Sequence, residues 1–264
     1  REPLKANTHG TYNVAIGYNS LTSLTTGDHN TTIGTGSGAA INTGQYNTIV
    51  GSGAGDLITD GHNNVVIGND ALRTSTSVGY AIAIGESAVA NGNVTDAADG
   101  VIGIGKGALY ATITGAKNTA IGYEALSGDT DGGSNVAIGY QAGKQLTGST
   151  RNTIVGQGAL SAPNGTADNL ADCVVVGYEA FKGHADNTTT GANGTTSIGS
   201  FSLNALTSGS GCTAVGYESL KTITSGVSCT AIGHQAGKLI TGSLNTVVGF
   251  QAADSLASGT SNTV

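Results

Sequence analysis

Three cysteines are the most reactive side chains in this sequence, and they share one register of a repeated motif. Cys173, Cys212 and Cys229 stand where other copies of the motif have asparagine. Cys212 and Cys229 are one repeat apart, so stacked repeats would separate them by about 4.8 Å. That spacing permits a disulfide or two free thiols in a small buried column. We expect free structural thiols, since no Cys/His spacing of a metal site is present.

Carboxylates also recur at one place in the motif. Glu124, Glu179 and Glu218 hold it in three copies, and Gln141 and Gln235 hold it in the copies that follow. Alternating Glu with Gln avoids stacking like charges on neighbouring strands. A glycosidase needs two carboxylates about 5–10 Å apart, and no column supplies an adjacent pair. We therefore expect no enzyme, no cofactor and no metal site.

An aromatic column is the third feature with chemical potential. Its members follow the motif's glycine directly: Tyr18, Tyr123, Tyr140, Tyr178, Tyr217 and Phe250. Such a column could hold sugars, but the interpretation that we favour is that it covers a corner of the folded repeat.

A period of about 17 residues positions all of these side chains. Asn118–Leu126 reads Asn-Thr-Ala-Ile-Gly-Tyr-Glu-Ala-Leu, and Asn135–Gly143 and Asn152–Gly156 repeat it. The motif's glycine recurs at steps of 16 to 22 residues, at Gly17, Gly34, Gly51, Gly68, Gly85, Gly105, Gly122, Gly139, Gly156, Gly177, Gly199, Gly216, Gly233 and Gly249. A fixed period over the whole chain predicts a solenoid, in which each unit buries its apolar face on its neighbours. We expect one repeat domain over residues 1–264, with about 14 coils and a partial one.

Each copy predicts a short β-strand immediately before the glycine. The last strand residue is always Ile or Val, as in Ile121, Ile138 and Val155, and alternation places it on the same face as the residue two earlier. We predict that this face points into the coil. The other face is also apolar, and a strand that is apolar on both faces is usually buried on both, so we expect a homo-oligomer. The asparagines at the start of the motif, such as Asn118, Asn135 and Asn152, should form a stacked amide ladder.

Composition limits the partners. The chain has 44 glycines, 10% charged residues and a formal net charge of −7, which is unfavourable for binding nucleic acid. No apolar run approaches the ~20 residues of a membrane-spanning helix. The last three residues begin another copy of the motif, so we expect a segment of a longer fibre.

The long steps of the repeat predict three loops, Asn91–Ala97, Ser161–Asn169 and Gly183–Gly194. Insertions in solenoids often lie on a binding face, although tolerated, solvated lengthening is the simpler interpretation. If the chain binds laterally, the candidate receptor-binding residues are Asp96, Asn164, Asp168, His184, Asp186 and Asn187.

These repeats resemble those of two families of trimeric fibres. Asn-Thr/Ser-x-Ile-Gly resembles the head repeats of YadA-type trimeric autotransporter adhesins. The alternation of Gly-Tyr-x-Ala-Leu with Gln-Ala-Gly, as in Tyr123–Leu126 and Gln141–Gly143, is similar to bacteriophage tail-fibre repeats. The resemblance implies a left-handed, β-roll-like parallel solenoid, intertwined or side by side as a homotrimer, on a virion or bacterial cell surface.

The leading hypothesis is therefore an extracellular structural and adhesive fibre segment that displays a surface for a host glycan or protein. A second hypothesis is an ice-binding or other regular-surface solenoid, motivated by a threonine column (Thr31, Thr48, Thr119, Thr153, Thr213 and Thr230). We rank it lower because Val and Ile interrupt that column and because we place it on the inward face. A third is a glycan-cleaving phage tailspike.

Overall fold

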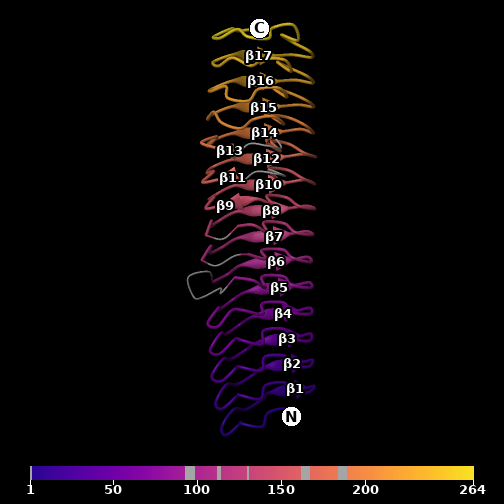
Figure 1. Cartoon of the computed structure of the whole chain (residues 1–264), viewed down its shortest axis with the longest axis vertical. Helices are drawn as coiled ribbons and strands as arrows, with labels where there is room; N and C mark the ends of the chain where they lie inside the picture. The colour runs from indigo at the N-terminus through magenta and orange to yellow at the C-terminus, as the bar shows by residue number, and fades with distance from the viewer. Residues whose placement is uncertain (1, 93–98, 112–113, 130, 162–166, 184–188) are drawn as a thin grey trace. The chain divides into compact units, whose positions relative to one another are not determined.

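The computed structural model is all-β, with no helix among the residues that it describes. Those residues are 2–92, 99–111, 114–129, 131–161, 167–183 and 189–264. The chain divides into two compact units, Arg1–Asp131 and Gly132–Val264. Each unit is a parallel β-solenoid with a repeat of about 17 residues, as the sequence predicts (Figure 1).

The first unit stacks one short strand per coil. Neighbouring strands are parallel and pair one repeat apart, so that Val14 lies beside Thr31 and Ile16 beside Ile33. The strands are β1 (Val14–Ile16), β2 (Thr31–Ile33), β3 (Thr48–Val50), β4 (Val65–Ile67), β5 (Ile82–Ile84), β6 (Ile102–Ile104) and β7 (Thr119–Ile121).

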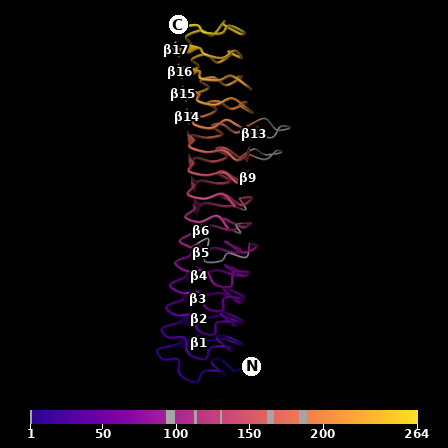
Figure 2. The same ribbon diagram turned by 90° about the vertical axis from the view of Figure 1, so that its left-hand side faces the viewer.

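The second unit repeats this arrangement and adds a small sheet. Its main strands are β8 (Val136–Ile138), β10 (Thr153–Val155), β12 (Val174–Val176), β14 (Thr196–Ile198), β15 (Thr213–Val215), β16 (Thr230–Ile232) and β17 (Thr246–Val248). The second sheet contains β9 (Leu146–Thr147), β11 (Ala167–Asp168) and β13 (Thr189–Thr190). Figure 2 shows β9 and β13 on the other side of the coil from β14–β17.

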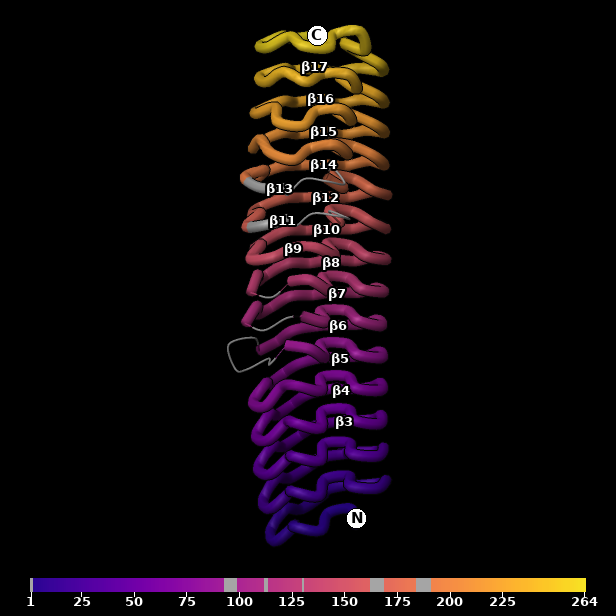
Figure 3. Tube along the Cα trace, in the orientation of Figure 1, coloured from indigo at the N-terminus to yellow at the C-terminus, as the bar shows by residue number. Residues whose placement is uncertain are grey.

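The turns are also hydrogen-bonded from coil to coil. Within each unit, the turns of successive coils lie one above another (Figure 3). The N–H of Gly36 donates to the carbonyl of Tyr18 at 2.8 Å, and that of Asn42 donates to Thr59 at 2.8 Å. Stacking therefore satisfies backbone groups along the turns as well as along the strands.

The structure corrects our prediction of which strand face points inward. Ile121 and Ile138 are 36% and 39% exposed, whereas Ala120 and Ala137 between the outward positions are fully buried. Val155 is likewise on the outward face, and Ile154 beside it is buried. The strand has three residues, so two of them share a face; alternation defines that pair but does not say whether it points in or out.

The space inside the coil explains the result. Large side chains from the second half of the coil, such as Leu21, Leu24 and Ile41, fill the interior. The middle strand residue faces them and is often small, as Ala83 and Ala120 are. Leu21 has a positive φ of 48°, a conformation that costs roughly 1–2 kcal/mol and that burial of its side chain offsets at about 1.5–3 kcal/mol.

In some coils, glycine stands at the position that Leu21 holds in its own coil. Another apolar side chain then fills the space inside the coil. A Cβ on Gly38 would lie 2.9 Å from Cδ1 of Ile41 and 3.2 Å from Cγ2 of Thr32. The alternation of Ala-Leu with Ala-Gly copies in the sequence is therefore a packing pattern of the core.

The repeated glycine after each strand lies against the next coil. Gly68 has a φ of +135°, and a Cβ there would lie 2.5 Å from the carbonyl oxygen of Gly85. The column thus excludes side chains both by backbone conformation and by lack of space.

We expect Gly68→Ala to destabilise the solenoid by roughly 3 kcal/mol or more, because it meets both obstacles. Gly36→Ala is the matched control. Gly36 has a φ of +69° with open space around it, and Asn19, at the equivalent place one coil earlier, has a φ of 60°. The control should lose about 1 kcal/mol. Chemical-denaturation midpoints would measure both, and equal losses would contradict the steric role of the column.

Candidate functional site

The outward face of the strands continues from coil to coil along each unit. The first and third residues of every main strand point outward, and all of them are Thr, Val or Ile. Many are well exposed, including Ile16 at 57% and Ile232 at 43%. A face of this composition, uncharged and half exposed along consecutive strands, is typical of an interaction surface.

Threonines form an unbroken row on this face in the second unit. Thr196, Thr213, Thr230 and Thr246 are in register on β14, β15, β16 and β17. Each is partly or fully exposed. The expected inward position of Thr31, Thr48, Thr119, Thr153, Thr213 and Thr230 is therefore wrong, because each is the first residue of its strand and points outward.

A ladder of five aromatic rings lies beside the strands of the second unit. It consists of Tyr178, Phe201, Tyr217, His234 and Phe250, with centroids 5.2–6.1 Å apart. Tyr178 and Tyr217 follow β12 and β15 by two residues. Both are 42% exposed, so their rings are open to solvent. Our sequence analysis included the tyrosines and Phe250 but missed Phe201 and His234. Phe201 lies two residues after the motif's glycine, and His234 lies directly after it. A search for any aromatic ring at these two positions would have found both.

An ion-pair cluster lies next to this ladder and is built around Glu218. Its carboxylate, only 8% exposed, is 2.6 Å from Nζ of Lys221 and 2.6 Å from Nζ of Lys238. Nε2 of Gln235 donates to it at 2.8 Å. Hydrogen bonds from Lys221 and then Lys238 lower the pKa of Glu218 to about 2. The expected alternation of Glu with Gln thus produces a direct bond between neighbouring coils.

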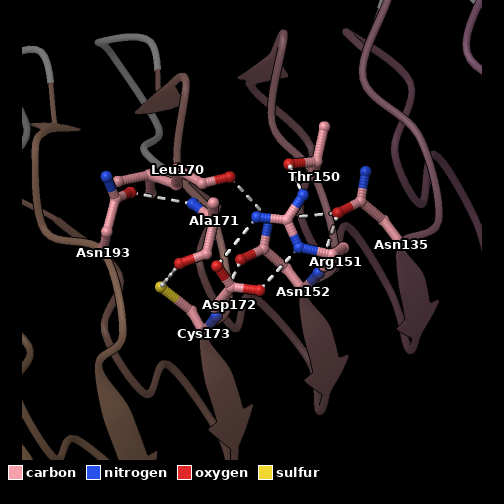
Figure 4. Close-up of polar contacts among 9 residues, drawn as sticks. All are labelled: Asn135, Thr150, Arg151, Asn152, Leu170, Ala171, Asp172, Cys173 and Asn193. Atoms are coloured by element: carbon pink, nitrogen blue, oxygen red, sulfur yellow. Dashed lines mark hydrogen bonds and ion pairs between the residues drawn. The ribbon is translucent and has the colours of Figure 1, made fainter.

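Buried amides connect the coils at the start of each strand. Nδ2 of Asn152 donates to Oδ1 of Asn135 at 3.0 Å and to the carbonyl of Leu170 at 2.9 Å (Figure 4). Oδ1 of Asn152 accepts from the N–H of Cys173 at 3.0 Å. In the first unit Asn30, Asn47 and Asn64 form the same ladder, and Asn118, which starts a later coil, is fully buried.

The cysteines take the asparagine place and are free thiols. Cys173, Cys212 and Cys229 are buried, and none of them forms a disulfide. Sγ of Cys212 contacts the carbonyl of Gly226 at 3.2 Å, and Sγ of Cys229 contacts that of Gly242 at 3.3 Å. The hydrogen bond with Cys229 and burial raise the pKa of Cys212, and burial raises that of Cys173. Cys173 and Cys212 are therefore poor nucleophiles at neutral pH, whereas the hydrogen bond with Cys212 lowers the pKa of Cys229.

Of the six residues proposed for lateral receptor binding, the structure describes only Asp168. Asp96, Asn164, His184, Asp186 and Asn187 lie outside the residues that the structure describes. The backbone of Asp168 belongs to β11, which pairs with β9 and β13.

No protein-family model, curated protein or solved structure matches this chain. Within the described residues, no cluster of three or more His, Cys, Asp or Glu could hold a metal ion. The same residues contain no helix able to cross a membrane.

The Glu218 cluster predicts a dependence of stability on acid. The pKa of its carboxyl is about 4.5 in the unfolded chain and about 2 in the folded chain. The stabilisation is therefore complete above pH 4.5 and is lost as the pH falls from 4.5 towards 2. Unfolding midpoints measured from about pH 6 to pH 2 should fall more steeply for the natural chain than for Glu218→Gln. Parallel curves for the two proteins would show that Glu218 is not the responsible group.

Proposed function

We propose that this chain is a structural and adhesive fibre segment that works extracellularly as a homotrimer, on a virion or a bacterial cell surface. The observation that supports this proposal best is the outward strand face. Its Ile, Val and Thr columns leave apolar area in water at every coil, with no charged residue among them. Parallel strands with apolar residues on both faces are normally covered on both sides.

A second copy of the chain is the covering that fits this face best. The surface repeats at each coil, at about 4.8 Å, and an identical solenoid carries the same spacing and the same side chains. Two such faces can pack coil against coil along their length, whereas a globular partner would match only a few coils. The choice of three copies, and of a virion or cell-surface setting, is supported by the resemblance of the repeats to those of trimeric adhesins and phage fibres.

The adhesive part of the proposal concerns surfaces that assembly leaves open. The described turns, such as the exposed one at Thr224 and Ser225, lie away from the outward strand positions and would remain accessible in an assembled fibre. A host-surface glycan or protein is the partner that this location favours.

The proposal predicts a mass close to three times 25.8 kDa by light scattering. Ile232→Lys should reduce the mass to that of one chain, because the side chain at this 43% exposed place would put three charges into a contact from which water is excluded. Ser225→Lys, at an exposed turn position, carries the same charge and should leave the mass unchanged. A natural chain that stays monomeric would contradict the homotrimer.

The in-register threonine row supports a second candidate function, an ice-binding surface. One of the two grounds for ranking it low was the inward placement of the threonines, and they point outward. The other ground, interruption of the column by Val and Ile, holds elsewhere in the chain but not from β14 to β17. Four successive threonines with the same outward direction form a regular array of hydroxyl and methyl groups at about 4.8 Å. This function requires the face to be open to water, so it competes directly with the homotrimer.

A thermal-hysteresis measurement tests this candidate. If the surface binds ice, the natural chain should separate its freezing and melting points, and Thr213→Lys should remove most of the gap by disturbing the array. Thr224→Lys, in an exposed turn, should preserve it. Absence of hysteresis in the natural chain would eliminate ice binding.

A further inference from the structure

We propose that the first unit carries a binding site for an uncharged sugar, at the point where Asn63 interrupts a ladder of aromatic side chains. This inference deepens the proposed adhesive function, because it names the class of ligand and the residues that would hold it. It rests on an aromatic ladder, on a cavity at its end and on the polar groups that line that cavity.

The ladder is formed by the residue just before the asparagine of each motif. Tyr12 stacks on His29 with centroids 4.8 Å apart and planes at 15°, and His29 stacks on Tyr46 at 4.9 Å and 6°. The separation is that of neighbouring coils, so each coil adds one nearly parallel ring. Tyr46 is 53% exposed and is the last ring of this stack.

The next coil has Asn63 in the same place, and the column has no ring there. Tyr80 follows one coil later and forms a T-shaped pair with His62, with centroids 5.2 Å apart and planes at 81°. One face of Tyr46 is stacked on His29, and the other points along the column towards Asn63, where the column has no ring. The interruption therefore leaves room for a flat ligand of about the thickness of one coil.

A shallow, open cavity of about 380 Å³ occupies this place. Its lining is Thr43, Gln45, Tyr46, Asp60, His62 and Asn63. They come from the same turn in two adjacent coils. A volume of this size matches a small ligand.

The lining combines the two kinds of group that bind a pyranose. The ring face of Tyr46 offers an apolar platform to the C–H face of a sugar with equatorial hydroxyls. The carboxylate of Asp60 accepts hydrogen bonds from sugar hydroxyls, and the amides of Gln45 and Asn63 both donate and accept. None of the six described lining residues is a lysine or an arginine, so the carboxylate disfavours acidic sugars.

The site also offers a variant that closes it without changing the fold. Asn63 has a φ of 57°, and the column neighbours Tyr46 and Tyr80 have φ values of 58° and 57°. Tyrosine therefore fits the backbone at residue 63. Asn63→Tyr should extend the ladder by one ring and fill the cavity.

Saturation-transfer NMR on the full chain, with methyl β-D-glucopyranoside and methyl β-D-galactopyranoside as probes, tests the proposal. We expect transfer to the ring protons of at least one probe, and much less to N-acetylneuraminic acid. Tyr46→Ala and Asn63→Tyr should each weaken binding about tenfold. Tyr12→Ala is the matched control, since Tyr12 belongs to the same ladder, is 78% exposed and does not line the cavity.

Transfer that is absent with both neutral probes, or that persists unchanged in Asn63→Tyr, would overturn the site. Stronger transfer to N-acetylneuraminic acid than to the neutral sugars would also overturn it. Light scattering on the same samples keeps this result separate from the fibre proposal. If the protein is a trimer that binds no sugar, only the sugar site is contradicted. If it is a monomer whose sugar binding depends on Tyr46, only the homotrimer is contradicted.

Discussion

The close approach of successive coils at the repeated glycine is the constraint on which the rest of the structure depends. At Gly68 and its equivalents, the backbone of the next coil occupies the space where a side chain would begin. With a positive φ at each of these glycines, the chain turns out of its strand at the same point in every coil. The coils therefore stack in register, and each place in the motif becomes a column.

Columns give single side chains properties that they would not have alone. An amide at one asparagine can bond to the amide of the next coil, as Asn152 does with Asn135. A carboxylate with a glutamine above it gains a hydrogen bond where a second carboxylate would repel it. Rings one coil apart stack at the spacing that the backbone imposes. Departures from the pattern are informative for the same reason, since replacing one member, as Asn63 does, changes a local part of the surface.

The period, the strand positions and the parallel stacking could all be predicted, because they follow from the glycine spacing and from β-prone residues before it. The inward face could not be predicted from alternation alone, and our choice was wrong. A better indicator was present: asparagine and cysteine at the start of the motif have the same parity as Ala120 and Ala137, and a buried amide ladder would have assigned that parity to the interior. The partners of Glu218 depend on how a turn places Lys221 and Lys238, and the cavity at Asn63 depends on how a turn is folded. Neither the ion-pair partners nor the cavity is determined by the period of the repeat.

The hydrogen bonds between coils run parallel to the direction of stacking, and this has a mechanical consequence. Tension applied along a unit loads the few bonds of one terminal coil at a time, so that coils peel away in sequence. A coil of about 17 residues adds about 4.8 Å while stacked and more than roughly 50 Å once drawn out. A solenoid of this design would therefore yield to a strong pull in repeated small steps, dissipating energy at each one, and would rewind when the load is removed.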